Sequence, residues 1–355
     1  MASNGPMILC DSLVKIYKVQ DLEVFALQGL DLVIERGEFM ALVGPSGSGK
    51  SSLMNILGGL DRPSAGKAIV DGQDLLKLSN FALTRYRRQK VGFVWQQPSR
   101  NLIPYLSVEE NVELPMIVAG MPYGERKAWT RELLETVNLW DRRHHSLAQL
   151  SGGEQQRTAI GVSLANKPVL LLADEPTGEV DTSTAQVIMD TLRLLNEQYG
   201  LTILLVTHDV RVSGQVDRVV TIRDGRTSSE RVRRLREQSS ADEAVVVAEQ
   251  PEAVAAPEPQ VDYHEYVVVD YAGRLQLPRE YLEAMGISDR AQVDLTDEGI
   301  VVRPARGVAD ASSQAARVSE VAETWGPQQQ SKDWRLRFAD ASRGLRGLLR
   351  QKKEQ

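Results

Sequence analysis

The sequence predicts an α/β protein with one large and one small domain. Residues 7–230 alternate short apolar segments of strand length with amphipathic helical segments, the pattern of an α/β domain. The chain has 355 residues, 42% hydrophobic and 25% charged, which is ordinary for a globular protein and enough for two domains. Near residue 237 the composition shifts toward Ala, Glu, Pro and Ser, and strand-like alternation returns at 261–305. We therefore expect a large α/β domain, a linker and a small, mostly β domain.

Composition and charge exclude several classes of protein. The longest apolar run, Val169–Ala173, is far shorter than the roughly 18–20 residues that span a bilayer. The N-terminus has no basic segment followed by an apolar core, so we expect no secretory signal. The single cysteine, Cys10, cannot form an internal disulfide, which fits a reducing cytoplasm. The net charge of −6 argues against a surface devoted to nucleic acid.

A phosphate-binding loop is expected between a strand at 38–43 and a helix at 52–60. Glycines in such a loop let backbone N–H groups point at phosphate oxygens, and the helix N-terminus adds partial positive charge. Lys50 would neutralise the β and γ phosphates of a nucleotide, and the Ser51 hydroxyl would ligate Mg²⁺. A glycine-rich turn is the alternative, which the strand–helix context disfavours. We therefore expect ATP to be held by Gly44, Pro45, Ser46, Gly47, Ser48, Gly49, Lys50, Ser51 and Ser52.

A pair of acids follows a second apolar strand. This strand, Val169–Ala173, leads into Asp174 and Glu175. Carboxylates at the C-terminal end of a parallel strand lie at the ligand edge of the sheet. Asp174 would hold Mg²⁺, through water, and Glu175 would be the general base toward the water that attacks the γ-phosphate. The alternative, a solvated strand end, is disfavoured by the phosphate-binding loop in the same chain.

The segment Leu150–Arg157 (LSGGEQQR) resembles the signature motif of ABC transporter nucleotide-binding subunits. Asp174–Gly178 (DEPTG) also matches that family. The residues themselves suggest a second anion-binding helix terminus, because a serine and two glycines precede an expected helix at 154–166. The resemblance implies that hydrolysis needs two subunits arranged head to tail. In that arrangement the γ-phosphate held by the opposite subunit contacts Ser151, Gly152 and Gly153.

Further site residues follow from the same resemblance. Gln96, rather than its neighbour Gln97, corresponds to the loop glutamine that reaches Mg²⁺ and senses the membrane partner. His208 corresponds to the switch histidine that holds the γ-phosphate and the attacking water. Asp181 corresponds to the aspartate that links the two active sites. Tyr17 corresponds to the aromatic residue that stacks on adenine, and a core tyrosine is the alternative.

Three further segments resemble one subgroup of this family, the ATPases of the lipoprotein-release and macrolide-export group (LolD and MacB types). These segments are Val24–Leu32, Leu53–Pro63 and Glu109–Pro115. ATPases of that group serve a separate or fused permease. Because no membrane span is expected here, a separate permease is implied, with this protein in the cytoplasm at the inner face of the membrane. The permease contact is expected at residues 97–120, where core packing is the alternative for the apolar side chains. An ATPase acting on ribosomes or DNA is disfavoured, because ribosome-acting relatives usually carry two ATPase units.

Residues 261–305 resemble the swapped-hairpin domain of AbrB-like transition-state regulators. The expected elements are strands at 266–270, 291–295 and 299–303 and a helix at 279–285. In that family two copies interleave their strands, and DNA binding is common. The segment has four basic and nine acidic residues, whereas phosphate binding needs the opposite sign. We therefore expect dimerisation, with an ATP-responsive DNA-binding regulator as the alternative function.

The end of the chain predicts a basic amphipathic helix. Trp334, Phe338, Ala341, Leu345 and Leu348 recur at helical spacing among basic residues. Such a helix suits an anionic membrane surface or a partner protein, and a solvated helix or frayed end is the alternative. The full expected organisation is an ATPase domain with a helical subdomain at 1–230, a basic then acidic linker at 231–260, the AbrB-like domain at 261–305, a linker at 306–330 and this helix at 331–355.

Overall fold

The computed structural model describes residues 5–19, 22–208, 214–235, 261–269, 273, 275–277, 279–287, 291–296 and 299–304. The chain divides into two compact units, one up to Pro278 and one from Arg279 onward. Most of the expected linker at 231–260, the linker at 306–330 and the basic helix at 331–355 lie outside the described residues. Among the described residues, no helix is long and apolar enough to cross a membrane.

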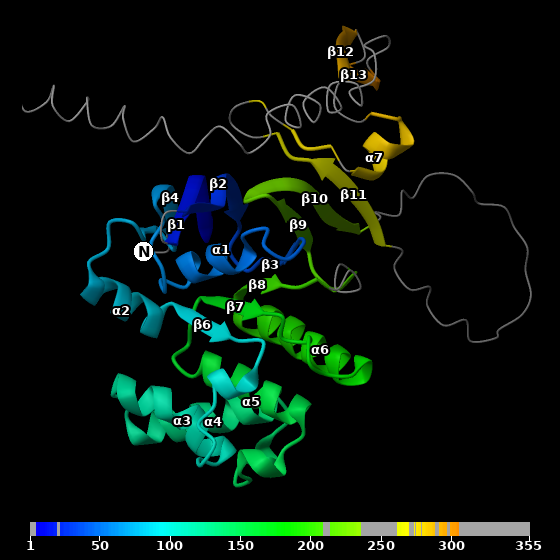
Figure 1. The fold of residues 1–355 in the computed structure, drawn as a ribbon. Helices are drawn as coiled ribbons and strands as arrows, with labels where there is room; N and C mark the ends of the chain where they lie inside the picture. The colour runs from blue at the N-terminus through cyan, green and yellow to red at the C-terminus, as the bar shows by residue number, and fades with distance from the viewer. Residues whose placement is uncertain are drawn as a thin grey trace, which may run out of the picture. The chain divides into compact units, whose positions relative to one another are not determined.

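A seven-stranded sheet is the centre of the first unit (Figure 1). Five of its strands are parallel; β10 runs antiparallel to its neighbour β9, and β11 runs antiparallel to β10. The residues of β3, β7 and β8 are almost all buried, as expected for parallel strands covered on both faces. In spatial order the strands are β6 (Val91–Val94), β7 (Leu170–Asp174), β8 (Thr202–Val206), β3 (Phe39–Val43), β9 (Arg218–Arg223), β10 (Arg226–Leu235) and β11 (Val261–Val267).

A second, antiparallel sheet covers helix α1 (Lys50–Leu57). Leu30 from this sheet, Leu57 from α1 and Leu172 from β7 are fully buried in one apolar cluster, so α1 is packed between the two sheets. This packing holds the start of α1 at the end of β3. The strands, in spatial order, are β2 (Leu22–Ile34), β1 (Ile8–Val19), β4 (Ala65–Val70) and β5 (Gln73–Asp74).

Helices α3, α4 and α5 form the expected helical subdomain, in which each helix packs against the other two. Their apolar side chains join a second buried cluster that also contains residues of β3, β7, β8 and α6. This cluster connects the helical subdomain to the face of the central sheet opposite α1. Besides α1, the described helices of the first unit are α2 (Asn80–Gln89), α3 (Val108–Ala119), α4 (Tyr123–Thr136), α5 (Gly152–Leu164) and α6 (Thr182–Tyr199), with 3₁₀ turns at Pro98–Arg100, Trp140–Arg142 and Leu147–Gln149.

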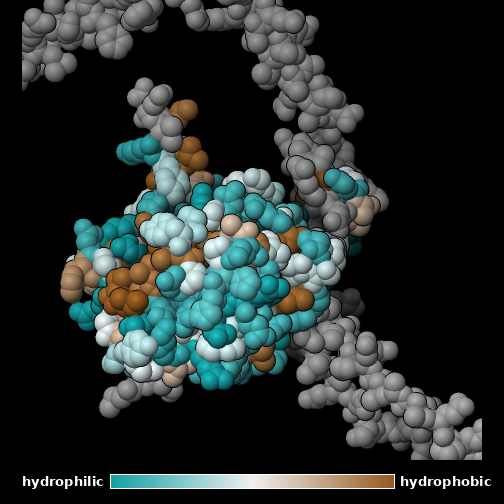
Figure 2. Space-filling model, turned by 90° about the horizontal axis from the view of Figure 1, so that it is seen from below, coloured by the Kyte–Doolittle hydropathy of each residue, from teal (hydrophilic) through white to brown (hydrophobic). Residues whose placement is uncertain are grey.

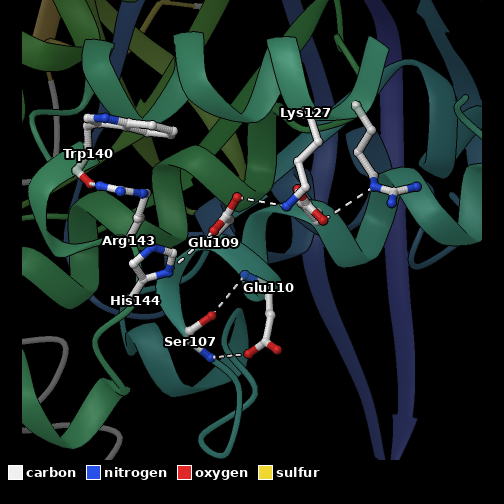
Figure 3. Close-up of polar contacts among 9 residues, drawn as sticks. Ser107, Glu109, Glu110, Lys127, Trp140, Arg143 and His144 are labelled. Atoms are coloured by element: carbon white, nitrogen blue, oxygen red, sulfur yellow. Dashed lines mark hydrogen bonds and ion pairs between the residues drawn. The ribbon is translucent and has the colours of Figure 1, made fainter. Parts of the chain in front are cut away.

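An ion-pair network joins α3 to α4 (Figure 3). The Lys127 Nζ lies 2.8 Å from Glu109 Oε1 and 2.7 Å from Glu113 Oε1. Hydrogen bonds to Glu109 and then to Glu113 raise the pKa of Lys127. His144 Nδ1 lies 3.6 Å from the second oxygen of Glu109.

At the start of α3, the Glu110 N–H donates to the hydroxyl of Ser107 in a capping box.

The expected end of the ATPase domain at residue 230 and the expected start of the small domain at residue 261 differ from the structure. Strand β10 continues to Leu235, so the basic residues at 231–235 belong to the sheet rather than to a linker. Strand β11 pairs with β10 along seven residues, so 261–267 belong to the ATPase sheet rather than to a separate domain. The backbone groups of β10 need hydrogen-bond partners, and the register places acidic residues of β11 opposite basic residues of β10.

The second unit contains a short helix and a β-hairpin close to the expected positions. The helix is α7 (Arg279–Ala284), and the hairpin consists of β12 (Ala291–Thr296) and β13 (Gly299–Pro304). Val293 lies opposite Val302 in the hairpin, and Ile300 lies on the same face as Val302. Val293 is 63% exposed and Ile300 67%, so this apolar face is largely uncovered within the described residues.

Candidate active site

A cavity of about 350 Å³ opens at the C-terminal edge of β3, β7 and β8. It brings together residues of the phosphate-binding loop, the two acids after β7 and the histidine after β8. These groups are far apart in the sequence and meet because the three strands are parallel neighbours. The cavity is lined by Val24, Phe25, Ala26, Gly44, Ser46, Gly47, Gly49, Lys50, Ser51, Ser52, Asp174, Glu175, Val206 and His208.

The loop from Gly44 to Gly49 requires glycine at its two ends. Gly44 has φ of 155° and Gly49 has φ of 102°, both in the region that disfavours other residues. An added Cβ at Gly44 would lie 2.2 Å from the carbonyl oxygen of Ile222, and one at Gly49 would lie 2.4 Å from that of Ala26. Pro45 and Ser48 belong to the same loop. The loop is therefore held tightly against the neighbouring strands in a fixed conformation.

Lys50 places its ammonium group inside the loop. Its Nζ donates to the carbonyl oxygens of Gly44 at 2.7 Å and Pro45 at 2.8 Å. Burial lowers the pKa of Lys50, while the negative charges of Glu175 and Asp174 act in the opposite direction. Because α1 begins at Lys50, the Ser51 and Ser52 residues lie in its first turn, beside the N-terminal partial positive charge. The loop and helix together make an anion-binding site.

The two acids have different environments. Asp174 is the last residue of β7, and burial, followed by the charge of Glu175, raises its pKa. Glu175 has φ of 46°, a left-handed conformation that costs energy for a non-glycine residue. Its N–H donates to the carbonyl oxygen of Val206 at 2.8 Å, which holds this strained backbone in place. The Glu175 carboxylate is thereby fixed in the cavity wall.

His208 faces Glu175 across the cavity. The distance from His208 Nδ1 to Glu175 Oε1 is 3.1 Å, within hydrogen-bond range. The His208 side chain is 71% exposed, whereas that of Glu175 is 23% exposed. A carboxylate that can accept a proton and an imidazole that can donate or accept one are thus adjacent, beside an anion-binding loop. This arrangement can bind a phosphate chain and activate a water molecule toward it.

The signature segment and Asp181 form a separate cluster. Ser151 caps α5, and its hydroxyl accepts a hydrogen bond from the Glu154 N–H at 3.3 Å. Gly153 is buried, and an added Cβ there would lie 2.2 Å from Thr184 Cγ2. The Thr184 hydroxyl donates to Asp181 at 2.6 Å. Thr184 therefore connects the signature helix to the residue that caps α6.

Neither end of this cluster lines the cavity of its own chain. Ser151 and Gly152 are exposed, and an added Cβ at Gly152 would meet nothing within 4 Å among the described residues. Hydrogen bonds from Ser183, then from Thr184, hold the pKa of the Asp181 carboxyl far below its ordinary value. The N-terminus of α5 thus presents backbone N–H groups on the surface, away from the phosphate-binding loop of the same chain.

Two expected site residues also lie outside the cavity lining. The Tyr17 hydroxyl donates to Asp61 at 3.0 Å, and the Lys15 ammonium lies 4.7 Å from the centre of its ring. Gln96 is exposed just after β6, the strand next to β7. The roles expected for Tyr17 in adenine stacking and for Gln96 in Mg²⁺ binding remain predictions.

Sequence reasoning did not assign the apolar wall of the cavity to a site. Val24 and Phe25 of β2 are 50% and 52% exposed, and both line the cavity. Their neighbour Ala26 lines it as well. Because successive side chains of a strand point to opposite faces, the consecutive apolar residues Val24, Phe25 and Ala26 place apolar side chains on both faces of β2. An apolar side chain on the face that is not in the core is a signal, available in the sequence, that this face contacts a ligand.

Comparison with known proteins gives a consistent result. A family model described as ABC transporter matches residues 27–178. The lipoprotein-releasing system ATP-binding protein LolD 2 of Caulobacter vibrioides is 43% identical over 229 residues, covering 64% of this chain and 100% of that protein. The macrolide export ATP-binding/permease protein MacB 2 of Aeromonas hydrophila is 44% identical, covering 64% of this chain and 35% of that protein.

A solved structure supports the same fold. It is the dimeric structure of the ATP-binding cassette MJ0796, a Methanocaldococcus jannaschii protein, in a post-hydrolysis state bound to ADP and Pi. Its TM-score is 0.58 and its sequence identity 42%, covering 63% of this chain and 97% of the other. The covered share confirms an α/β ATPase fold for the large part of the first unit.

Proposed function

The chain belongs to the family of ABC transporter ATP-binding proteins, and on that premise we propose that two copies work head to tail and drive a separate membrane permease. The single observation that carries this proposal is the cavity in which Lys50, Glu175 and His208 meet. The loop binds the phosphates, the acid is positioned to activate water, and the histidine contacts that acid. Together these groups support ATP hydrolysis as the source of the motion.

In the proposed reaction, Glu175 Oε1 accepts a proton from the water that attacks the γ-phosphorus. The bond between that phosphorus and the β–γ bridging oxygen breaks, and ADP leaves with the bridging oxygen. Lys50 balances charge that develops on the phosphate oxygens, at a site whose burial strengthens the interaction. His208, held 3.1 Å from Glu175, orients the water and the γ-phosphate. Glu175, Lys50 and His208 thus each have a separate role in the proposed hydrolysis.

The residues also fit Mg²⁺, which we propose accompanies ATP. The Ser51 hydroxyl and the Asp174 carboxylate are hard oxygen donors on the same cavity wall. Asp174 has a raised pKa because it is buried beside Glu175, and a divalent cation would relieve that cost. In the described parts of the chain, no group of three or more His, Cys, Asp or Glu side chains is placed to hold a metal ion by itself. Two protein donors plus phosphate and water suit Mg²⁺, which neutralises phosphate charge when bound. Gln96 is a further proposed ligand.

The head-to-tail arrangement follows from the positions of the two anion-binding sites. Ser151 and Gly152 are exposed at the start of α5 and do not line the cavity of their own chain. A second copy would bring its own Ser151, Gly152 and Gly153 to the γ-phosphate. Asp181 is joined to this segment through Thr184, so it would transmit the state of one site to the other. The dimeric MJ0796 structure supports this arrangement.

We further propose that the partner is a permease of the lipoprotein-release or macrolide-export group, which would place the protein at the inner face of the cell membrane. The similarity to the LolD and MacB proteins supports this group. Figure 2 shows apolar surface on the face seen from below, and exposed apolar side chains of the helical subdomain include Tyr105, Ile117 and Val118. These residues lie within 97–120, the segment expected to contact the permease.

The hairpin of β12 and β13 is proposed to contact a second copy, as in the AbrB-like domain. Its apolar face, with Val293 and Ile300 exposed, is what a strand-interleaved dimer would bury. The alternative DNA-binding regulator is not favoured, because residues 261–305 carry nine acidic and four basic residues. A contact of the basic segment 331–355 with anionic lipid or a partner also remains a proposal.

The test of the proposed function uses Glu175→Gln in the full chain. This variant should bind ATP with near-normal affinity, hydrolyse it at least about 100-fold more slowly, and sediment as a dimer with ATP and Mg²⁺. Glu197→Gln, the same change at an exposed position of α6, is the matched control and should keep parental turnover. A Glu175→Gln protein that binds ATP yet stays monomeric would refute the head-to-tail scheme, and normal turnover would remove Glu175 as the base.

A further inference from the structure

The turn between β9 and β10 is bonded directly to the phosphate-binding loop. The Gly225 N–H donates to the carbonyl oxygen of Ser48 at 3.1 Å, and the Gly225 carbonyl accepts from the Gln28 N–H at 3.0 Å. Ser48 is only 3% exposed and lies next to Gly49, at the start of α1. The turn is therefore bonded to the loop backbone at Ser48, although Gly225 itself does not line the cavity.

The carbonyl of Ala26 fills the space between this turn and the loop. An added Cβ at Gly225 would lie 2.7 Å from the Ala26 oxygen, and one at Gly49 would lie 2.4 Å from the same atom. Ala26 also lines the nucleotide cavity. A shift of the turn would thus move the Ala26 carbonyl against Gly49, because close-packed backbone leaves no free space.

Strand β11 extends the same hairpin, because it pairs with β10. Seven residues of β10, Ser229–Leu235, pair with β11, and the Val268 N–H donates to the Ser228 carbonyl at 3.0 Å. The register places Arg231 opposite Glu265. Cross-strand pairs of opposite charge stabilise antiparallel pairing. Strand β11 therefore stabilises the hairpin whose turn holds the phosphate-binding loop.

We propose that Gly225 is a positioning residue for the phosphate-binding loop, and that β11 acts through it to raise nucleotide affinity. Strand β11 is then a regulatory strand. Its pairing with β10 holds the loop in the conformation that binds phosphate, and its release weakens nucleotide binding. This inference rests on the proposed function, since it concerns the same nucleotide site, but it adds a control element outside the cavity.

The first arm of the test compares two glycine variants of the full chain by calorimetric titration with Mg²⁺–ADP. Gly225→Ala should weaken ADP binding about tenfold or more, because the added methyl displaces the Ala26 carbonyl and the loop. Gly200→Ala is the matched control: Gly200 also has positive φ, 61°, but an added Cβ meets nothing within 4 Å. Both variants should lose stability without nucleotide, and only Gly225→Ala should lose affinity. Equal affinities would overturn the role of Gly225.

The second arm tests β11 with charge reversal and rescue. Glu265→Arg should weaken ADP binding about two- to fivefold, and adding Arg231→Glu should restore it, because the register then again pairs residues of opposite charge. Glu283→Arg makes the same charge change at an exposed position of α7 and should bind ADP as the parent does. Unchanged affinity in Glu265→Arg would overturn the role of β11. A parental chain that binds no ADP would instead refute the proposed function.

Discussion

Gly153 of the signature helix lies directly against Thr184 at the start of α6, so close that one added carbon would come within 2.2 Å of the threonine methyl. Gly152, the neighbouring residue, has open space around its Cα. The two glycines therefore have different reasons to lack a side chain. One permits close packing between helices, and the other leaves the helix terminus accessible.

This contrast predicts different effects of alanine at the two positions. Gly153→Ala should push α6 and its cap Asp181 away from α5, lowering the midpoint of thermal unfolding by several degrees and reducing ATP turnover. Gly152→Ala should leave stability unchanged or raise it slightly, because alanine favours helix, while hindering contact with a second copy. Thermal melts and ATPase assays of both variants check this, and equal destabilisation would contradict the packing account.

The apolar wall of the cavity predicts which residue contacts the base of the nucleotide. Phe25→Ala should weaken ATP binding by about three- to tenfold, because it removes an aromatic side chain from the lining. Tyr17→Ala should leave affinity nearly unchanged, because Tyr17 does not line the cavity and its hydroxyl bonds to Asp61. Titration with a fluorescent ATP analogue separates the two. A larger loss in Tyr17→Ala than in Phe25→Ala would instead support the stacking role predicted for Tyr17.

The cap of α6 predicts a pH-dependent stability. Asp181 has a lower pKa in the folded chain than when unfolded, because Ser183 and Thr184 donate hydrogen bonds to its carboxylate. Its stabilising contribution is therefore present above the unfolded pKa, about 4, and is lost as pH falls toward the folded pKa. The melting-temperature difference between the parent and Asp181→Ala should be largest near neutral pH and shrink below about pH 4. A difference that stays constant from pH 7 to pH 3 would show that the charge is not responsible.

The ion-pair network of the helical subdomain predicts a stability loss without a direct effect on chemistry. Lys127→Met removes the cation that contacts both Glu109 and Glu113, and the Glu113 side chain is only 9% exposed. The variant should lose about 1–3 kcal/mol of unfolding free energy in urea melts. Lys77→Met is the control, because Lys77 is 81% exposed and its pair with Asp74 contributes little. Equal losses in the two variants would show that burial does not matter here.

The sequence predicted several polar residues that line the cavity, but it did not predict the apolar residues that line it. The glycine-rich loop predicted Lys50, the apolar strand before them predicted Asp174 and Glu175, and the family resemblance implied His208. The structure places all four in a single cavity. Phe25 was not assigned to the site, because periodicity shows that a strand has two faces but not which face meets a ligand.

The boundaries after residue 230 could not be predicted from the sequence for a different reason. By local composition, the basic residues near Arg231 belong to a linker and the acidic residues near Glu265 to a small domain. Their pairing depends on the register of two strands separated by more than twenty residues along the chain. Local composition carries no information on which distant strand will supply backbone partners.

The pairing of β10 with β11 also bears on how the protein behaves at high concentration. A long strand that ends a sheet with unpaired N–H and C=O groups is a template for aggregation with other chains. In this chain Val261–Val267 occupies those groups along β10. Proteolysis or truncation before residue 261 would move the edge of the sheet from β11, which has seven residues, to β10, which has ten. Because a longer edge strand is a better template for pairing, shortened forms of the protein should form oligomers more readily than the intact chain.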